Sequence, residues 1–164
     1  MKRNLNASIL GFCFILVASS FVTEIKDSAS ITHSPGKTYS DTLDVSAYKG
    51  KVVIINFWAS WSKSSRAENK NIVRVYEKYR QISKLVFVSV SLDTDQASWK
   101  AAIEEDEMDW PTHICDFKKY ASPIAKQYAV VTLPKIFLID KQGKIHSSAS
   151  KMSDIEASID ALLK

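Results

Sequence analysis

The chain has 164 residues, enough for one domain of ordinary size, and its 46% hydrophobic and 24% charged residues are typical of a globular protein rather than a disordered or fibrous one. The net charge is +4, and it falls to +2 without residues 1–20, which carry Lys2 and Arg3 and no acid. A charge so close to neutral argues against the basic surface that binds nucleic acid. We therefore expect no nucleic-acid partner.

Residues 1–20 have the three-part pattern of a secretory signal peptide. A short basic start at 1–6 precedes an apolar run at 7–18, and the small residues at 18–20 are suitable for cleavage. The apolar run is shorter than the ~20 residues that a membrane-spanning helix needs. We expect export to the bacterial periplasm or cell envelope, and a membrane association only if this segment stays uncleaved as an anchor.

Residues 21–38 are polar and contain the turn signal Ser34-Pro35-Gly36. They are expected to form a tether that leads into a single domain at 39–164. The chain shows no internal repeat that would indicate a second domain.

Two near-continuous apolar runs, at 52–58 and 85–92, predict strands buried on both faces. Residues 63–80 between them place apolar side chains at helical spacing. A strand, a helix and a strand in this order predict a right-handed crossover between parallel strands.

The second half of the chain predicts two more helices, a hairpin and a closing helix. The helices are expected at 94–108 and 118–128, and the hairpin strands at 136–140 and 145–149. Residues 153–156 read as a capping box that opens the closing helix. The order indicates an α/β fold in which parallel strands come first and an antiparallel hairpin plus a helix completes the sheet.

Residues 56–68, after the first predicted strand, read NFWASWSKSSRAE. This segment resembles the TlpA/ResA branch of envelope thiol-disulfide oxidoreductases in the thioredoxin superfamily, in which NFWASW is followed by C-x-x-C-R-x-E at a helix start. Ser62 and Ser65 stand where the resemblance places the two cysteines. The resemblance implies a thioredoxin-like three-layer sandwich over residues 39–164, with a central mixed sheet flanked by helices.

A proline ahead of the third predicted strand adds to the resemblance. Leu133-Pro134 occupies the place of the family's cis-proline, which lies opposite the active site. In the family, the backbone before this proline pairs with a substrate polypeptide. The resemblance therefore implies a surface that binds a polypeptide or a redox-partner protein, and its expected residues are Trp61, Lys63, Ser64, Leu133 and Pro134.

The replacement of both cysteines removes the chemistry that the resemblance implies. In a working site, the helix N-terminus stabilises the first cysteine as a thiolate, which attacks a disulfide, and the second cysteine resolves the mixed intermediate. A serine hydroxyl stays protonated at ordinary pH and forms no disulfide. We therefore expect Ser62 and Ser65 to be redox-inactive caps of the helix, with no cofactor and no metal site.

Three alternatives remain open. Cys115 is the one thiol left if Cys13 is removed with residues 1–20, and it is either an inert core cysteine or a redox group that acts with partner-supplied thiols. Ser62 could act as a hydrolytic nucleophile only with an oriented base such as His113 beside it. The serines could also be engineered substitutions that inactivate an enzyme.

Three further features are expected to have mainly structural roles. Trp58 is expected in the core, and Glu68 either serves a family role or simply suits the first turns of a helix. The acidic run at 104–107 is expected to be a solvated face.

Overall fold

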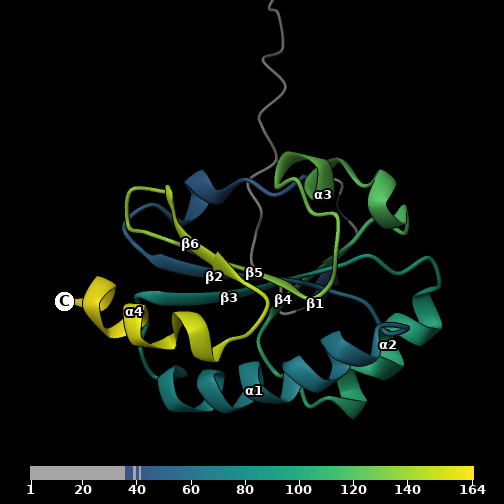
Figure 1. Cartoon of the computed structure of the whole chain (residues 1–164), viewed down its shortest axis with the longest axis horizontal. Helices are drawn as coiled ribbons and strands as arrows, with labels where there is room; N and C mark the ends of the chain where they lie inside the picture. Colours follow the sequence, from purple (N-terminus) through teal and green to yellow (C-terminus); the bar gives the residue numbers. More distant parts are fainter. Residues whose placement is uncertain (1–35, 39, 41) are drawn as a thin grey trace, which may run out of the picture. The chain divides into compact units, whose positions relative to one another are not determined.

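The computed structural model describes residues 36–38, 40 and 42–164 (Figure 1). The predicted signal peptide at 1–20 and all but the end of the predicted tether lie outside these residues. The described residues form one six-stranded sheet with the strand order β1-β4-β3-β2-β5-β6. The strands are β1 (Gly36–Thr38), β2 (Val52–Trp58), β3 (Leu85–Ser91), β4 (Thr112–Cys115), β5 (Lys135–Ile139) and β6 (Ile145–Ala149).

Helices cover both faces of the sheet (Figure 1). They are α1 (Lys63–Tyr79), α2 (Gln96–Glu105), α3 (Pro123–Gln127) and α4 (Ser153–Leu163), with the 3-10 turns η1 (Val45–Tyr48) and η2 (Lys119–Ala121). One core lies between the sheet and α1, α2 and α4, and a second lies between the sheet and η1 with α3. None of the helices in the described ranges is long and apolar enough to cross a lipid bilayer.

The sheet has the predicted mixture of strand directions. β1, β4, β3 and β2 run parallel to one another, and β5 and β6 add to β2 as an antiparallel hairpin. Every residue of β2 is buried, and its side chains alternate between the two cores because successive residues of a strand point to opposite faces. The three-layer α/β sandwich is thus confirmed.

Two strands were not predicted. β4 has only four residues and follows Pro111 directly, so its pattern is too short to read as a strand. β1 pairs in parallel with β4, which places Gly36–Thr38 in the sheet rather than in the tether expected at 21–38. Neither strand has a recognisable hydrophobic pattern of its own. Each is held in the sheet by pairing with a strand that is distant in the sequence.

Two helix predictions need correction. The expected helix at 118–128 is divided into η2 and α3, because Ser122 caps α3 and Pro123 occupies its first turn. The expected capping box at 153–156 does not form, and α4 has no side-chain cap from its own segment. Glu156 instead pairs with Arg74 and Lys78 of α1.

Candidate functional site

Ser62 lies in the loop between β2 and α1 and caps the helix. Its backbone is extended, and its Oγ accepts a hydrogen bond from the backbone N–H of Ser65 at 3.3 Å. The first turns of a helix leave backbone N–H groups without partners in the helix, and a serine at this position satisfies one of them. The predicted capping role of Ser62 agrees with this geometry.

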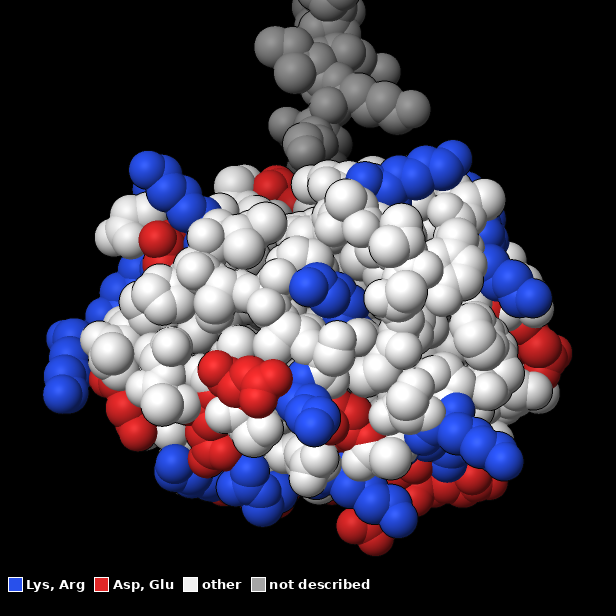
Figure 2. All heavy atoms as spheres, in the orientation of Figure 1, with Lys and Arg blue, Asp and Glu red and all other residues white. Residues whose placement is uncertain are grey.

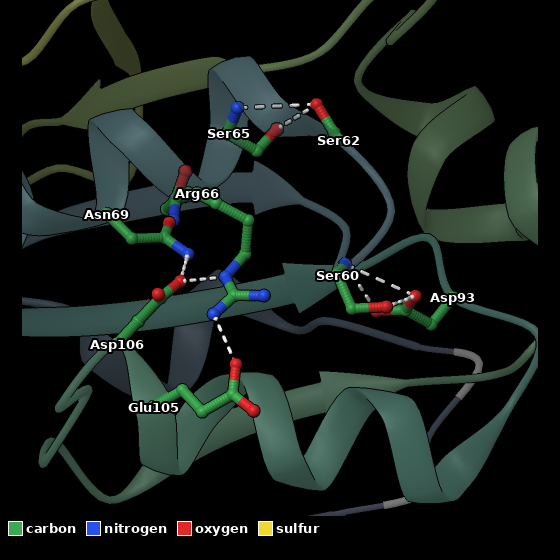
Figure 3. Close-up of polar contacts among 9 residues, drawn as sticks. Ser60, Ser62, Ser65, Arg66, Asn69, Asp93, Glu105 and Asp106 are labelled. Atoms are coloured by element: carbon green, nitrogen blue, oxygen red, sulfur yellow. Dashed lines mark hydrogen bonds and ion pairs between the residues drawn. The ribbon is translucent and has the colours of Figure 1, made fainter.

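The hydroxyls of the motif form a short chain. Ser65 Oγ donates to Ser62 Oγ at 2.8 Å (Figure 3). Ser62 Oγ also lies 3.2 Å from Ser64 Oγ. Ser65 is fully buried and Ser62 is nearly so. The two serines at the motif positions are therefore paired with each other, and Ser62 has hydroxyl and backbone partners rather than a base.

The motif meets the loop that carries Leu133 and Pro134. Ser64 Oγ donates to the backbone carbonyl of Leu133 at 3.3 Å, and the Leu133–Pro134 peptide bond is cis. Leu133 is half-buried and Pro134 is buried. The fold thus brings together two predicted site segments that lie 69 positions apart in the sequence.

The two tryptophans of the motif have different environments. Trp58 is fully buried at the end of β2, as expected for a core residue, whereas the Trp61 side chain is 49% exposed. The ammonium group of Lys119 lies over the Trp61 ring, 5.8 Å from its centroid. Lys63 is exposed beside Ser62.

Histidine does not support a hydrolytic site at Ser62. His113 is buried in β4, where its Nε2 lies 3.0 Å from the carbonyl oxygen of Met108 and its ring stacks on Trp110. His146 is exposed in β6, and His33 lies outside the described residues. Neither histidine of the described residues therefore pairs with a serine of the motif.

The fold and the motif place this chain among known proteins. A family model described as thioredoxin-like matches residues 50–145, more than half of the chain. The chain belongs to this thioredoxin-like family. The thiol-disulfide oxidoreductase ResA of Bacillus thuringiensis is 29% identical over 103 residues, which are 63% of this chain and 57% of that protein. The chain thus spans little more than half the length of that relative.

Solved structures of thioredoxin-like proteins agree with the fold. A thiol-disulfide oxidoreductase from Bacteroides fragilis is 31% identical, with a TM-score of 0.65 over 70% of this chain and 82% of that one. The thioredoxin domain of a thiol-disulfide oxidoreductase from Bacteroides vulgatus is 26% identical, with a TM-score of 0.65 over 73% of this chain and 84% of that one.

The remaining thiol of this thioredoxin-like domain is in the core. Cys115 ends β4 and is fully buried, with its Sγ 3.7 Å from the backbone carbonyl oxygen of Asp93. Burial raises the pKa of the Cys115 thiol above its ordinary value. A buried thiol with a raised pKa is the opposite of the exposed, easily ionised thiolate that disulfide exchange requires.

A polar network beneath the motif was not predicted. Arg66 Nε donates to Asp106 Oδ2 at 2.6 Å, and the Asn69 amide donates to the same oxygen at 2.7 Å (Figure 3). Asn69 in turn accepts a hydrogen bond from Asn56 of β2. The expectation that 104–107 is a solvated face is therefore wrong for Asp106, which is buried, and Glu105 also pairs with Arg66. The polar Asn56 within an apolar strand was the available signal.

A second polar cluster supports the loop before Ser62. Asp93 is buried after β3, and its carboxylate accepts hydrogen bonds from the backbone N–H and the hydroxyl of Ser60 and from the hydroxyl of Ser91. It thereby fixes the loop that leads from β2 to the motif. Asp95, two residues later, caps α2. No group of three or more His, Cys, Asp or Glu side chains within the described ranges could hold a metal ion.

Proposed function

We propose that this thioredoxin-like chain is a polypeptide-binding module that does not carry out dithiol–disulfide exchange. The observation that carries the proposal is the hydrogen-bonded pair of Ser62 and Ser65 at the motif positions, with Oγ atoms 2.8 Å apart. The helix N-terminus that would stabilise a thiolate here is capped by the neutral hydroxyl of Ser62 instead. Neither half of the exchange reaction has a sulfur atom at the site.

The alternative is an active oxidoreductase that uses Cys115 or thiols supplied by a partner. Full burial of Cys115 and its raised pKa weigh against the first form of this alternative. Within the described residues Cys115 also lacks a resolving thiol, so it would form only mixed or intermolecular disulfides. We therefore favour the binding module and propose no enzymatic reaction for it.

Support for binding comes from the surface around the motif. Trp61 is half-exposed, Ser64 is exposed, and Leu133 is only half-buried, with its backbone carbonyl bonded to Ser64. In this family such a loop offers its backbone to an extended polypeptide. The relatives are named as thiol-disulfide oxidoreductases, a name consistent with protein partners.

We also propose that the protein is exported to the cell envelope. This rests on the signal-peptide pattern of residues 1–20. Protease accessibility of the full chain in intact and osmotically opened bacteria tests it, because a cytoplasmic protein is protected in both.

Insulin reduction by dithiothreitol tests the loss of exchange chemistry. The natural chain is compared with Ser62→Cys/Ser65→Cys, and Cys115→Ala is added in both backgrounds. We expect the natural chain to be inert and the double-cysteine variant to be active, which would show an intact scaffold that lacks only its thiols. Activity in the natural chain that disappears in Cys115→Ala would overturn the proposal and assign the chemistry to Cys115.

A further inference from the structure

A hollow of about 400 Å³ is lined by residues of η2, of α3 and of the segment that follows α3. Its lining is mostly apolar and consists of Tyr120, Ala125, Lys126, Ala129, Val130 and Val131. The chain reaches Leu133 two residues after this lining, and Lys119 connects the hollow to Trp61 by lying over its ring. The hollow is thus adjacent along the chain to Leu133 and, through the contact of Lys119, to Trp61, two residues of the surface proposed to bind a polypeptide.

Two exposed apolar side chains, Tyr120 and Val131, line this hollow, and a third, Trp61, contacts Lys119, the residue before Tyr120. Val131 is 79% exposed and Tyr120 40%, and with Trp61 they are three of the five large hydrophobic side chains that are exposed in the described part of the chain. Single exposed apolar residues are ordinary, but a contiguous group marks a site of interaction. The grouping therefore indicates that another molecule covers these side chains.

The backbone around the hollow is strained. Phe117, Lys119 and Ala129 have positive φ angles, and they are three of the four non-glycine residues in the described ranges that do. Ala129 follows α3 where glycine is usual, since the backbone N–H of Val130 bonds back to the carbonyl of Ala125 at 2.8 Å. A Cβ is unfavourable in this conformation. Ala129, which lines the hollow, therefore has a conformational cost that glycine at the same position would avoid.

The rim of the hollow is basic. Lys126 lines it and Lys119 lies between it and Trp61, and neither is held in an ion pair within the described residues. Figure 2 shows lysine or arginine side chains bordering the uncharged surface around α3. Lysines beside an apolar hollow that have no carboxylate partner among the described residues are complementary to acidic residues on either side of an apolar residue of a partner.

We propose that this hollow holds one aromatic or large aliphatic side chain of an extended partner polypeptide, and that Lys119 and Lys126 pair with acidic residues that flank it. The inference rests on the proposed binding function and names its specificity: an acidic segment with a central apolar residue. The backbone of the partner runs past Leu133, and the apolar side chain enters the hollow against Tyr120 and Val131.

Fluorescence anisotropy with short labelled peptides tests the proposal. The first probe has a central Phe flanked by Glu, and two others replace Phe with Ala or Glu with Lys. We expect Val131→Ser to weaken binding of the first probe about fivefold through lost apolar burial. The matched control is Ile82→Ser, the same kind of change at an exposed site after the C-terminal end of α1, and it should have no effect. Lys126→Glu should weaken it to a similar extent, and the Lys-flanked probe should recover the loss. Lys100→Glu on α2 is the matched charge control.

Ala129→Gly separates binding from stability. Glycine relieves the strained backbone, so the unfolding midpoint should rise, while loss of the methyl wall should weaken binding of the Phe probe. If binding weakened because the fold was destabilised, the unfolding midpoint would fall instead. The midpoint therefore distinguishes a lost contact from a lost fold.

A further probe, which is a longer polypeptide, distinguishes this inference from the proposed function. Carboxymethylated insulin B chain has no free thiol and tests polypeptide binding as such. Suppose that the protein binds the insulin B chain but does not prefer the Glu-flanked Phe peptide, or that Val131→Ser binds that peptide as well as the natural chain does. Either result would overturn the proposed specificity and leave the proposed binding function intact. Failure of every peptide to bind would overturn both.

Discussion

Glu68 of α1 accepts a hydrogen bond from the backbone N–H of Met152 at 2.6 Å, across 84 positions of the sequence. Met152 precedes α4, which has no cap of its own, so a carboxylate from another helix satisfies the start of α4. Glu68 is also buried and accepts from Asn71. Glu68, three residues after Ser65, thus ties α1 to α4, the last helix of the domain.

Glu68→Ala should lower the free energy of unfolding by about 1–3 kcal/mol, because the buried N–H of Met152 loses its acceptor. Urea unfolding followed by circular dichroism measures the change. Glu68→Gln keeps a carbonyl oxygen at the same place and should lose less. Equal losses in the two variants would show that the negative charge, rather than the hydrogen bond, is responsible.

Asp106→Ala should destabilise the domain by about 2–4 kcal/mol, since it leaves Arg66 and the buried amide of Asn69 without their shared acceptor. The control is Glu105→Ala, which breaks the more exposed contact with Arg66 and should change stability by less than about 1 kcal/mol. Guanidinium unfolding of both variants provides the comparison. A similar effect at the two positions would contradict the structural role assigned to Asp106.

Ser62→Ala should lower stability by about 1 kcal/mol through loss of the cap of α1. Ser64→Ala, an exposed neighbour whose hydroxyl caps no backbone N–H, should change it by a few tenths of that amount. Thermal unfolding of the two variants side by side measures the difference. The capping role fails if Ser64→Ala is the more damaging change.

Stability should depend on pH through Cys115. Burial raises the thiol's pKa above the 9.0 of a free thiol, so the folded protein holds this proton more tightly than the unfolded chain does. The resulting stabilisation is complete below the unfolded pKa and is lost as pH rises through the folded pKa. We expect the stability advantage of the natural chain over Cys115→Ala to shrink as pH rises above about 9.

Thiol labelling checks the same burial independently. Ellman's reagent should react slowly with Cys115 in the folded protein and rapidly in urea, because the thiol is fully buried. Rapid labelling of the folded protein would show that the thiol is accessible and would revive the alternative in which Cys115 is a redox group.

Much of the fold was predictable because its central elements carry strong local patterns. Strand β2 was predicted with the bounds that the structure has, and α1 within one residue, since an unbroken apolar run and a helical spacing of apolar residues are unambiguous signals. β4 and β1 were missed because four and three residues carry too little pattern, and their pairing depends on neighbours that the sequence does not bring adjacent.

The motif residues were identified from resemblance, but their environments were not. The burial of Asp106 was hidden because the acidic run around it reads as a solvated face. Its partners Arg66 and Asn69 come from another helix, so only the packing of α1 against α2 determines that this carboxylate is enclosed. The predicted capping box at 153–156 does not form for a related reason. Glu156 forms ion pairs with Arg74 and Lys78 of α1.

The sequence by itself determined the α/β fold and the place of Ser62 and Ser65 at a helix start, because residue identity and local periodicity decide these. Only the tertiary structure decided that Cys115 is buried, that Ser64 contacts Leu133 and that Tyr120, Ala129 and Val131 enclose a hollow. Burial and contact between distant residues depend on how the layers pack, and no local pattern in the chain specifies that arrangement.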